Sequence, residues 1–160
     1  MDRGPAYRFV TQWRVDAPVA LVWPLLDDPE TWPHWWHGCE GVTRLAPTGA
    51  PSPVRRYRLR WRGPLPRQLD MTVTIIDEQP RRRLAGVVSG ELVGTAIWSM
   101  EGRPDHTLVG FDLAVDGARA WMRYLAPFTR PLFHWNHQRL MEQGRLGLAE
   151  QLSAATRAQR

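Results

Sequence analysis

Residues 7–15 read YRFVTQWRV, and this segment decides how the rest of the chain is interpreted. Aromatic and β-branched residues occupy its odd-numbered positions, while arginine and glutamine occupy most of the positions between them. Such alternation is typical of a β-strand with one buried face, so the segment predicts a half-buried strand. Asp16 follows directly and Pro18 comes two residues later, which suits a capping aspartate and a proline in the first helical turn. The sequence therefore predicts a strand that leads into a helix beginning near Ala17.

The helical segments after this strand are short, because proline and glycine interrupt them. Pro24 has no backbone N–H and disfavours a helical conformation at Trp23, so we expect the first helix to kink or end early. Asp28, followed by proline, supplies a second cap and predicts a short helix from Pro29 to Trp35. Gly38 is expected to end that helix.

Six further strand-like segments follow, separated by turn-forming pairs such as Gly-Pro, Gln-Pro and Gly-Glu. With the first strand they make seven candidates, and a succession of this kind favours an antiparallel sheet. The six segments cover residues 42–45, 55–61, 69–77, 83–89, 92–100 and 107–115.

The C-terminal part is predicted to be helical, since apolar residues recur there at helical spacing. Pro127 and Pro131 are expected to divide it into a short helix to about Ala126 and a long helix from about Phe128. The apolar stripe predicted for this region consists of Met122, Leu125, Leu132, Phe133, Leu140 and Leu148.

Length and composition predict one globular domain. The chain has 160 residues, of which 43% are hydrophobic, enough for a single packed core. We expect the domain to cover residues 1–160, with an ordered core of about 6–152 and a fraying tail. No apolar run is long enough to span a bilayer, and the N-terminus lacks the apolar core of a secretory signal. The single cysteine, Cys39, cannot form an internal disulfide, so we expect a cytoplasmic protein.

The basic residues exclude some chemistry and leave several partners open. All 21 are arginines, so catalysis through a lysine Schiff base or a P-loop lysine is excluded. The net charge of +5 suits anionic ligands, membranes or nucleic acid. Alternation between residues 55 and 62 places four arginines on one face and Tyr57 and Trp61 on the other. Exposed aromatics interleaved with arginine are therefore missing, and we expect no nucleic-acid partner. The four arginines are Arg56, Arg58, Arg60 and Arg62.

The order of these elements and several short motifs resemble the polyketide cyclase/dehydrase-like branch of the START/Bet v 1 (SRPBCC) superfamily. The resemblance covers nearly the whole chain. It is carried by residues 15–18 with Val22-Trp23, residues 28–38, residues 89–94 with Trp98, and Trp121-Met122, 125–127, Asn136-His137, Met141 and 144–148.

This resemblance implies an α+β helix-grip fold, in which a curved seven-stranded antiparallel sheet wraps around a long C-terminal helix. It also implies an apolar cavity that binds a lipid, a polyketide or a similar hydrophobic molecule. It does not imply catalysis, because many relatives of this kind only bind or carry ligands. Pro24 departs from the uninterrupted first helix of the pattern.

The tryptophan-rich segment DPETWPHWWHG, residues 28–38, raises the question of a metal site. His34 and His37 lie one helical turn apart with Cys39 nearby, but no HExxH motif or CxxC pair completes a ligand set. We therefore expect no metal and no other cofactor. The tryptophans are interpreted as a packing helix at one end of the grip, and a lid or a membrane contact stays open as an alternative.

Catalytic residues are not apparent. No GxSxG motif is present, and Cys39 has no evident base beside it. Alternation places Asp112 on the solvent side and Glu91 in a turn, while His34 and His37 are expected at the rim. We therefore predict that none of these four ionisable side chains enters the cavity.

Alternation and helical phase nominate the residues that bind the ligand. Two are polar: Thr11 on the inner face of the first strand, and Asn136 within the apolar stripe. Each is interpreted as either hydrogen-bonded to backbone or an anchor for a ligand carbonyl or hydroxyl. The predicted ligand-binding residues are Thr11, Trp13, Tyr57, Leu59, Trp61, Met71, Trp98, Phe111, Leu132, Phe133, Asn136 and Leu140.

The sequence thus predicts a binding protein, for transport or sequestration of a lipid, fatty acid or polyketide, and leaves enzyme activity open. One alternative is an aromatase/cyclase that folds a poly-β-keto chain and removes water. Another is a membrane-surface or interaction module that uses the basic face, with transient membrane contact. The oligomeric state stays open between monomer and homodimer.

Overall fold

The computed structural model describes residues 4–47, 49 and 54–159. Its elements follow the predicted order closely, and the first strand has the predicted bounds. The elements are β1 (Tyr7–Val15), α1 (Val19–Asp27), a 3-10 turn η1 (Pro29–Thr31), α2 (Trp32–Trp35), β2 (Cys39–Arg44), β3 (Arg56–Arg62), β4 (Gln68–Gln79), β5 (Arg83–Gly90), β6 (Leu92–Gly102), β7 (Thr107–Gly117) and α3 (Ala120–Ala158).

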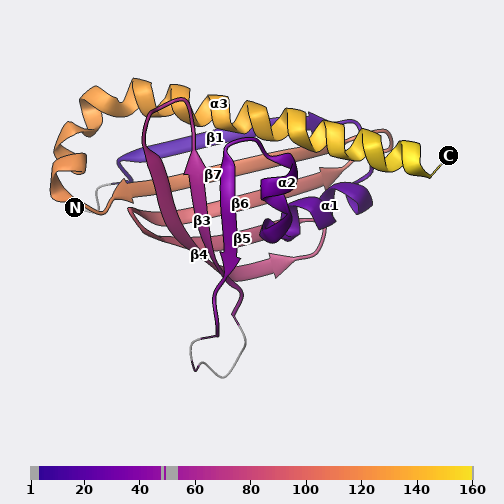
Figure 1. Ribbon diagram of the computed structural model, residues 1–160, viewed down its shortest axis with the longest axis horizontal. Helices are drawn as coiled ribbons and strands as arrows, with labels where there is room; N and C mark the ends of the chain where they lie inside the picture. The colour runs from indigo at the N-terminus through magenta and orange to yellow at the C-terminus, as the bar shows by residue number, and fades with distance from the viewer. Residues whose placement is uncertain (1–3, 48, 50–53, 160) are drawn as a thin grey trace.

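Within the described residues, seven strands form one antiparallel sheet in the order β1-β7-β6-β5-β4-β3-β2. Neighbours in the sheet are neighbours in the chain, except that β7 returns to pair with β1. The sheet is strongly curved, so that β2 and β3 run across the direction of β1 and β7 (Figure 1). Helix α3 lies along the curved sheet (Figure 1). The α+β helix-grip fold is therefore confirmed.

The first helix was expected to kink or end early at Pro24, and the early end was wrong. Pro24 lies inside α1, which continues to Asp27 rather than ending early. Pro24 is the sixth of nine residues, so it removes one backbone hydrogen bond, the one to the Ala20 carbonyl, and the helix continues for only three residues beyond it. The predicted cap at Asp16 is also absent, because Pro18 is the N-cap and Asp16 accepts a hydrogen bond from Arg14.

The second helical segment agrees with prediction. The Asp28 carboxylate accepts a hydrogen bond from the Glu30 N–H at 3.2 Å, as a capping aspartate should. The segment continues through η1 and α2 and ends before Gly38, whose φ of +104° suits glycine.

Helix α3 is continuous from Ala120 to Ala158, so the predicted division at the prolines was wrong. Pro127 and Pro131 lie within it, and its first part curves away from the axis of the rest (Figure 1). Proline removes one backbone hydrogen bond and bends a helix without necessarily breaking it. The helix also extends beyond residue 152, where fraying was expected. None of the helices that the structure describes is both long and apolar enough to cross a bilayer.

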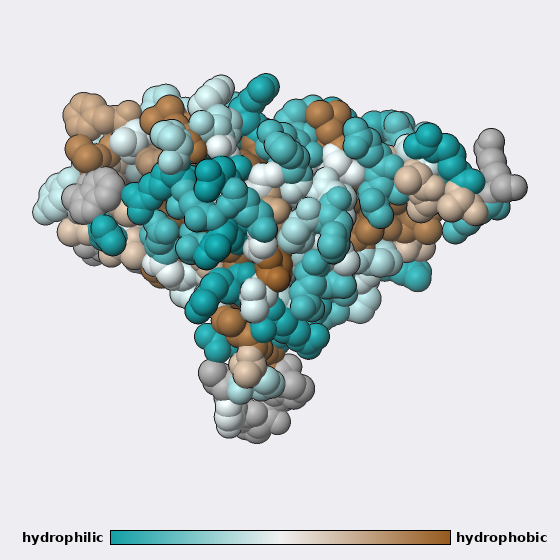
Figure 2. Space-filling model, viewed as in Figure 1, coloured by the Kyte–Doolittle hydropathy of each residue, from teal (hydrophilic) through white to brown (hydrophobic). Residues whose placement is uncertain are grey.

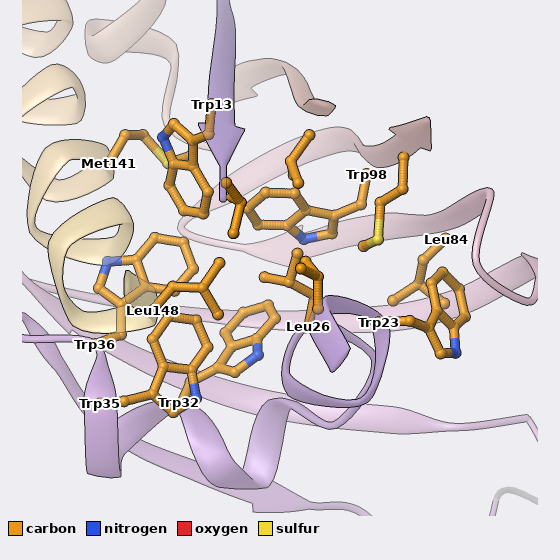
Figure 3. Close-up of a cluster of buried hydrophobic side chains, with 14 of the residues drawn as sticks. Trp13, Trp23, Leu26, Trp32, Trp35, Trp36, Leu84, Trp98, Met141 and Leu148 are labelled. Atoms are coloured by element: carbon orange, nitrogen blue, oxygen red, sulfur yellow. The ribbon is translucent and has the colours of Figure 1, made fainter. Parts of the chain in front are cut away.

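The tryptophan-rich segment packs into the core. Trp32, Trp35 and Trp36 are each at most 7% exposed and belong to a buried cluster that includes Trp13 and Trp98 (Figure 3). The interpretation as a packing helix is therefore confirmed, and a membrane wedge at this segment is excluded by burial.

Two glycines of α3 make this packing possible. A Cβ at Gly144 would collide with the Trp36 indole, and one at Gly147 would collide with the Trp35 carbonyl. The space beside these two glycines is therefore filled by the tryptophan segment and adds nothing to a cavity. The small residues allow α2 to approach α3 closely.

Candidate ligand-binding cavity

A cavity of about 260 Å³ lies between the sheet and α3. Side chains from β1, the sheet strands β3 to β7, the η1–α2 segment and α3 form its wall. Most of these side chains are aromatic or aliphatic, because the strands alternate and turn their apolar faces to the helix. The predicted apolar cavity is therefore present.

Nine of the twelve predicted ligand-binding residues line this cavity. They come from strands of the sheet and from α3, elements far apart in the sequence. They are Tyr57, Leu59, Trp61, Met71, Trp98, Phe111, Phe133, Asn136 and Leu140.

The other three predicted residues lie elsewhere. Trp13 is buried, but it packs against Trp36 and Trp98 at ring distances of 5.6 and 5.5 Å, behind the side chains that form the wall. Thr11 is half-buried on the inner side of β1 without reaching the wall. Leu132 is 47% exposed on the outer side of α3.

Leu132 was misplaced because the predicted stripe was too wide. At about 100° per residue, Leu132 and Leu148 lie about 160° apart around a helix, so they cannot face the same sheet. Leu148 is fully buried, and the inner side of α3 is therefore set by Phe133, His137 and Met141.

Several wall residues were missed although the sequence contained a signal for them. Tyr7 and Phe9 stand on the same face of β1 as Trp13, and both line the cavity. Trp32 and Trp36 also reach it from the packing segment. Strand phase was therefore sufficient to nominate the two β1 residues.

An ion pair marks one end of the cavity. Arg67 in the β3–β4 loop donates to the Glu91 carboxylate at 2.6 Å, and both residues line the cavity. The two side chains are 55% and 31% exposed, so this end faces solvent. A smaller hollow of about 190 Å³ adjoins them, next to Arg119 and Met122 at the start of α3. The prediction that Glu91 stays out of the cavity was wrong.

Asn136 connects α3 to the β3–β4 loop. Its Oδ1 accepts a hydrogen bond from the Leu65 N–H at 3.2 Å, which matches the backbone-bonding interpretation. Gly63 in the same loop leaves room for this amide, since a Cβ there would collide with it. Asn136 also lines the cavity, so an additional contact with ligand stays a prediction.

His137 is an ionisable cavity residue that the sequence interpretation overlooked. Its ring stacks on Phe9 with centroids 4.4 Å apart, and on Phe111 at 6.0 Å. Burial, reinforced by nearby His134, lowers the pKa of His137 to about 4. Its Nε2 is buried and has no hydrogen-bond partner among the described residues. The cavity thus contains a neutral imidazole with free hydrogen-bonding capacity.

The remaining ionisable candidates lie away from the cavity. Asp112 pairs with Arg8 at 2.7 Å on the solvent side of the sheet, as alternation predicted. His34 and His37 are absent from the wall. Cys39 is buried, and burial raises the pKa of its thiol to about 12, which suppresses the reactive thiolate. Among the residues that the structure describes, no three His, Cys, Asp or Glu side chains cluster as a metal site requires.

Solved structures share this fold at low sequence identity. A protein from Thermus thermophilus is 18% identical with a TM-score of 0.72, covering 93% of this chain and 99% of its own. A START superfamily protein from Mycobacterium smegmatis is 16% identical with a TM-score of 0.72, covering 92% and 98%. The Zhui aromatase/cyclase from a Streptomyces species is 15% identical with a TM-score of 0.73, covering 95% and 96%. At these identities the likeness establishes the fold alone.

Sequence comparison identifies the family. No curated protein matches the chain. The family model described as polyketide cyclase / dehydrase and lipid transport matches residues 7–151, which includes every strand of the described sheet and most of α3. The resemblance to polyketide cyclase/dehydrase-like proteins is thereby confirmed, and the chain belongs to the polyketide cyclase/dehydrase and lipid transport family.

Proposed function

We propose that the protein binds a hydrophobic small molecule, such as a lipid or a polyketide, in the cavity between the sheet and α3. The observation that supports this proposal is the cavity itself, which has a volume of about 260 Å³ and a largely aromatic and aliphatic wall. Ligand sites in proteins typically combine such a wall with a few polar groups. Asn136 and His137 provide those groups inside, and the Arg67–Glu91 pair provides them at the solvent-facing end.

Tryptophan fluorescence tests this proposal, because Trp32, Trp36, Trp61 and Trp98 line the cavity. An apolar dye or a fatty acid should bind at micromolar concentration and quench their emission. Ala96→Phe places a large side chain in the cavity and should weaken binding at least tenfold.

Thr95→Phe is the matched control, since Thr95 is the next residue of β6 and is exposed. It should bind like the original chain. Equal binding by Ala96→Phe and Thr95→Phe, or no quenching by any apolar ligand, would rule out the cavity as the binding site.

A second candidate is a cyclase that closes a ring in a poly-β-keto chain and removes water. The observation that favours it is His137, an imidazole inside the cavity that the lowered pKa keeps neutral. A neutral imidazole can accept a proton, and a pKa of about 4 makes His137 a weaker base than an ordinary histidine. It would take a proton from a carbon between two carbonyl groups, the enolate would attack a further carbonyl of the chain, and the imidazolium would return the proton to the alkoxide that forms. Elimination of the resulting hydroxyl with a neighbouring proton would release water.

Turnover of a poly-β-keto substrate separates the two candidates. A cyclase should convert it, and His137→Phe should abolish conversion while weakening substrate binding by no more than about tenfold. A binding protein should hold the substrate without turnover. If no turnover is found, ligand binding is retained as the proposed function. The single cysteine favours a cytoplasmic location for it.

The third candidate, a module that uses the basic face of β3, receives less support. Arg60 and Arg62 donate to Asp70 and Glu40 at 3.0 and 2.7 Å, so part of that positive charge is neutralised. A stretch of unbalanced positive charge lies elsewhere, on α3.

A further inference from the structure

The solvent side of α3 carries large apolar side chains near its start. Tyr124 and Phe128 are each 82% exposed, and they lie one helical turn apart. Leu125, Leu132 and Trp135 are 45–47% exposed along the same side. We call these five residues, Tyr124, Leu125, Phe128, Leu132 and Trp135, the outer face of α3. In Figure 2 hydrophobic side chains gather at the end of the molecule where α3 begins, while much of the rest of this view is hydrophilic.

The charged residues in this part of the sequence are all arginines. Between residues 119 and 141 the sequence has no aspartate or glutamate. Over the same stretch it has four arginines: Arg119, Arg123, Arg130 and Arg139. A helix that combines exposed aromatics with arginine and lacks carboxylates has the composition of helices that lie in the plane of an anionic membrane surface.

The inner side of the same segment faces the cavity. Met122 and Phe133 line the cavity wall, while Tyr124 and Phe128 point outward. Met122 also adjoins the smaller hollow beside the Arg67–Glu91 pair, at the solvent-facing end. The outer face therefore lies next to the end of the cavity at which a ligand would enter.

We propose that the outer face of α3 docks onto the surface of an anionic lipid bilayer. Tyr124 and Phe128 insert at the level of the headgroups, where aromatic side chains are favoured, and Arg139, which helical phase places on the same side of α3, interacts with lipid phosphates. Docking removes the exposed aromatic side chains of Tyr124 and Phe128 from water. The docking proposal rests on the exposure and charge of α3 and does not depend on what the cavity binds.

Vesicle cosedimentation tests the docking. The full chain should bind vesicles of phosphatidylcholine mixed with phosphatidylglycerol, bind pure phosphatidylcholine more weakly, and lose affinity as salt increases. Replacing both exposed aromatics, Tyr124→Ser with Phe128→Ser, should lower the partition coefficient at least tenfold, since two apolar anchors are lost.

Leu146→Ser is the matched control. Leu146 is 49% exposed on the same helix but lies beyond Glu142, outside the carboxylate-free stretch. This variant should bind vesicles like the original chain, and both variants should keep its melting temperature because the altered side chains are exposed.

Three results would overturn the proposal. The first is no binding to the anionic vesicles at low salt. The second is unchanged binding by the double variant. The third is that the original chain does not bind vesicles but dimerises with increasing concentration, as measured by sedimentation, and that the double variant abolishes this dimerisation. That result would assign the outer face to contact with a second copy of the chain. None of these results bears on ligand binding in the cavity, which fluorescence quenching tests separately.

Discussion

The indole N–H of Trp36 donates a hydrogen bond of 2.9 Å to the backbone carbonyl of Leu140. This bond joins the packing segment to the middle of α3, and Gly144, one turn further along, leaves the space in which the indole lies. Both Trp36 and Leu140 also line the cavity. This contact between the packing segment and α3 therefore also shapes the cavity.

Gly144→Ala should destabilise the protein by up to about 2 kcal/mol, which is the overpacking cost of about 1–3 kcal/mol less the gain in helix propensity. The added methyl group would collide with the Trp36 ring, and overpacking of this kind outweighs the gain of about 1 kcal/mol in helix propensity. Urea denaturation measures the difference. Gly41→Ala is the control, because nothing lies within 4 Å of a Cβ added at Gly41. A stabilised Gly144→Ala protein would show that the indole moves aside easily.

Stability should fall on acidification because of His137. Its pKa is lowered from 6.5 to about 4, mainly by burial and then by His134. Between these values the unfolded chain binds a proton that the folded chain does not, so the folded state loses stability as pH falls from about 6.5 towards 4. The loss attributable to this group is up to about 3 kcal/mol, and above pH 6.5 its contribution is constant.

Urea denaturation at several pH values checks this prediction. His137→Phe should flatten the dependence between pH 6.5 and 4, because phenylalanine does not titrate. His34→Asn should leave it unchanged, since His34 lies outside the cavity wall. An equally steep dependence in His137→Phe would assign the acid sensitivity to other groups.

Cys39 should react slowly with thiol reagents in the folded protein. It is 5% exposed, and its pKa is raised to about 12 chiefly by burial. Burial limits the access of a reagent to the sulfur, and the raised pKa lowers the fraction of Cys39 present as the reactive thiolate. A disulfide-exchange reagent should label it within minutes in concentrated denaturant and much more slowly in buffer. Rapid labelling in buffer would show that β2 opens locally.

The strands were predictable because alternation is a local signal. The bounds of β1 were correct, and the alternation around Tyr57 correctly separated the cavity side from the arginine side. Most of the predicted wall followed from this phase alone. The long helix was also predictable, but its prolines were given too much weight, because the local cost of Pro127 and Pro131 is a bend rather than a break.

The polar groups of the cavity were much harder to predict. Arg67 and Glu91 come from different loops, and only the pairing of β4 with β5 brings them together. His137 follows Asn136 directly, yet it was not nominated, because its place inside depends on the turn of helix between Phe133 and Met141. Alternation along a strand does not show which residues from distant parts of the sequence come into contact. Helical periodicity shows which side chains face the sheet only when the apolar stripe is limited to a narrow range of angles.

His137 should discriminate between ligands that differ by one oxygen. Its Nε2 is buried and has no partner among the described residues, and an unpaired buried polar group is costly unless a ligand satisfies it. Therefore 2-naphthol, whose hydroxyl can hydrogen-bond with the ring, should bind more tightly than 2-methylnaphthalene, which has nearly the same shape. One neutral hydrogen bond corresponds to a preference of roughly five- to tenfold. His137→Phe keeps a ring to stack on Phe9 and Phe111 but removes the nitrogen.

The variant should therefore bind 2-methylnaphthalene as well as the original chain or better, and lose the preference for 2-naphthol. Isothermal titration of both ligands with both proteins measures this ratio. A nitrogen NMR signal of the His137 ring that shifts with 2-naphthol and stays in place with 2-methylnaphthalene would give the same answer without a substitution. Equal ratios in the two proteins would mean that the ligand oxygen finds its partner elsewhere, with Asn136 as the next residue to change, because its amide is another neutral polar group that α3 presents to the cavity.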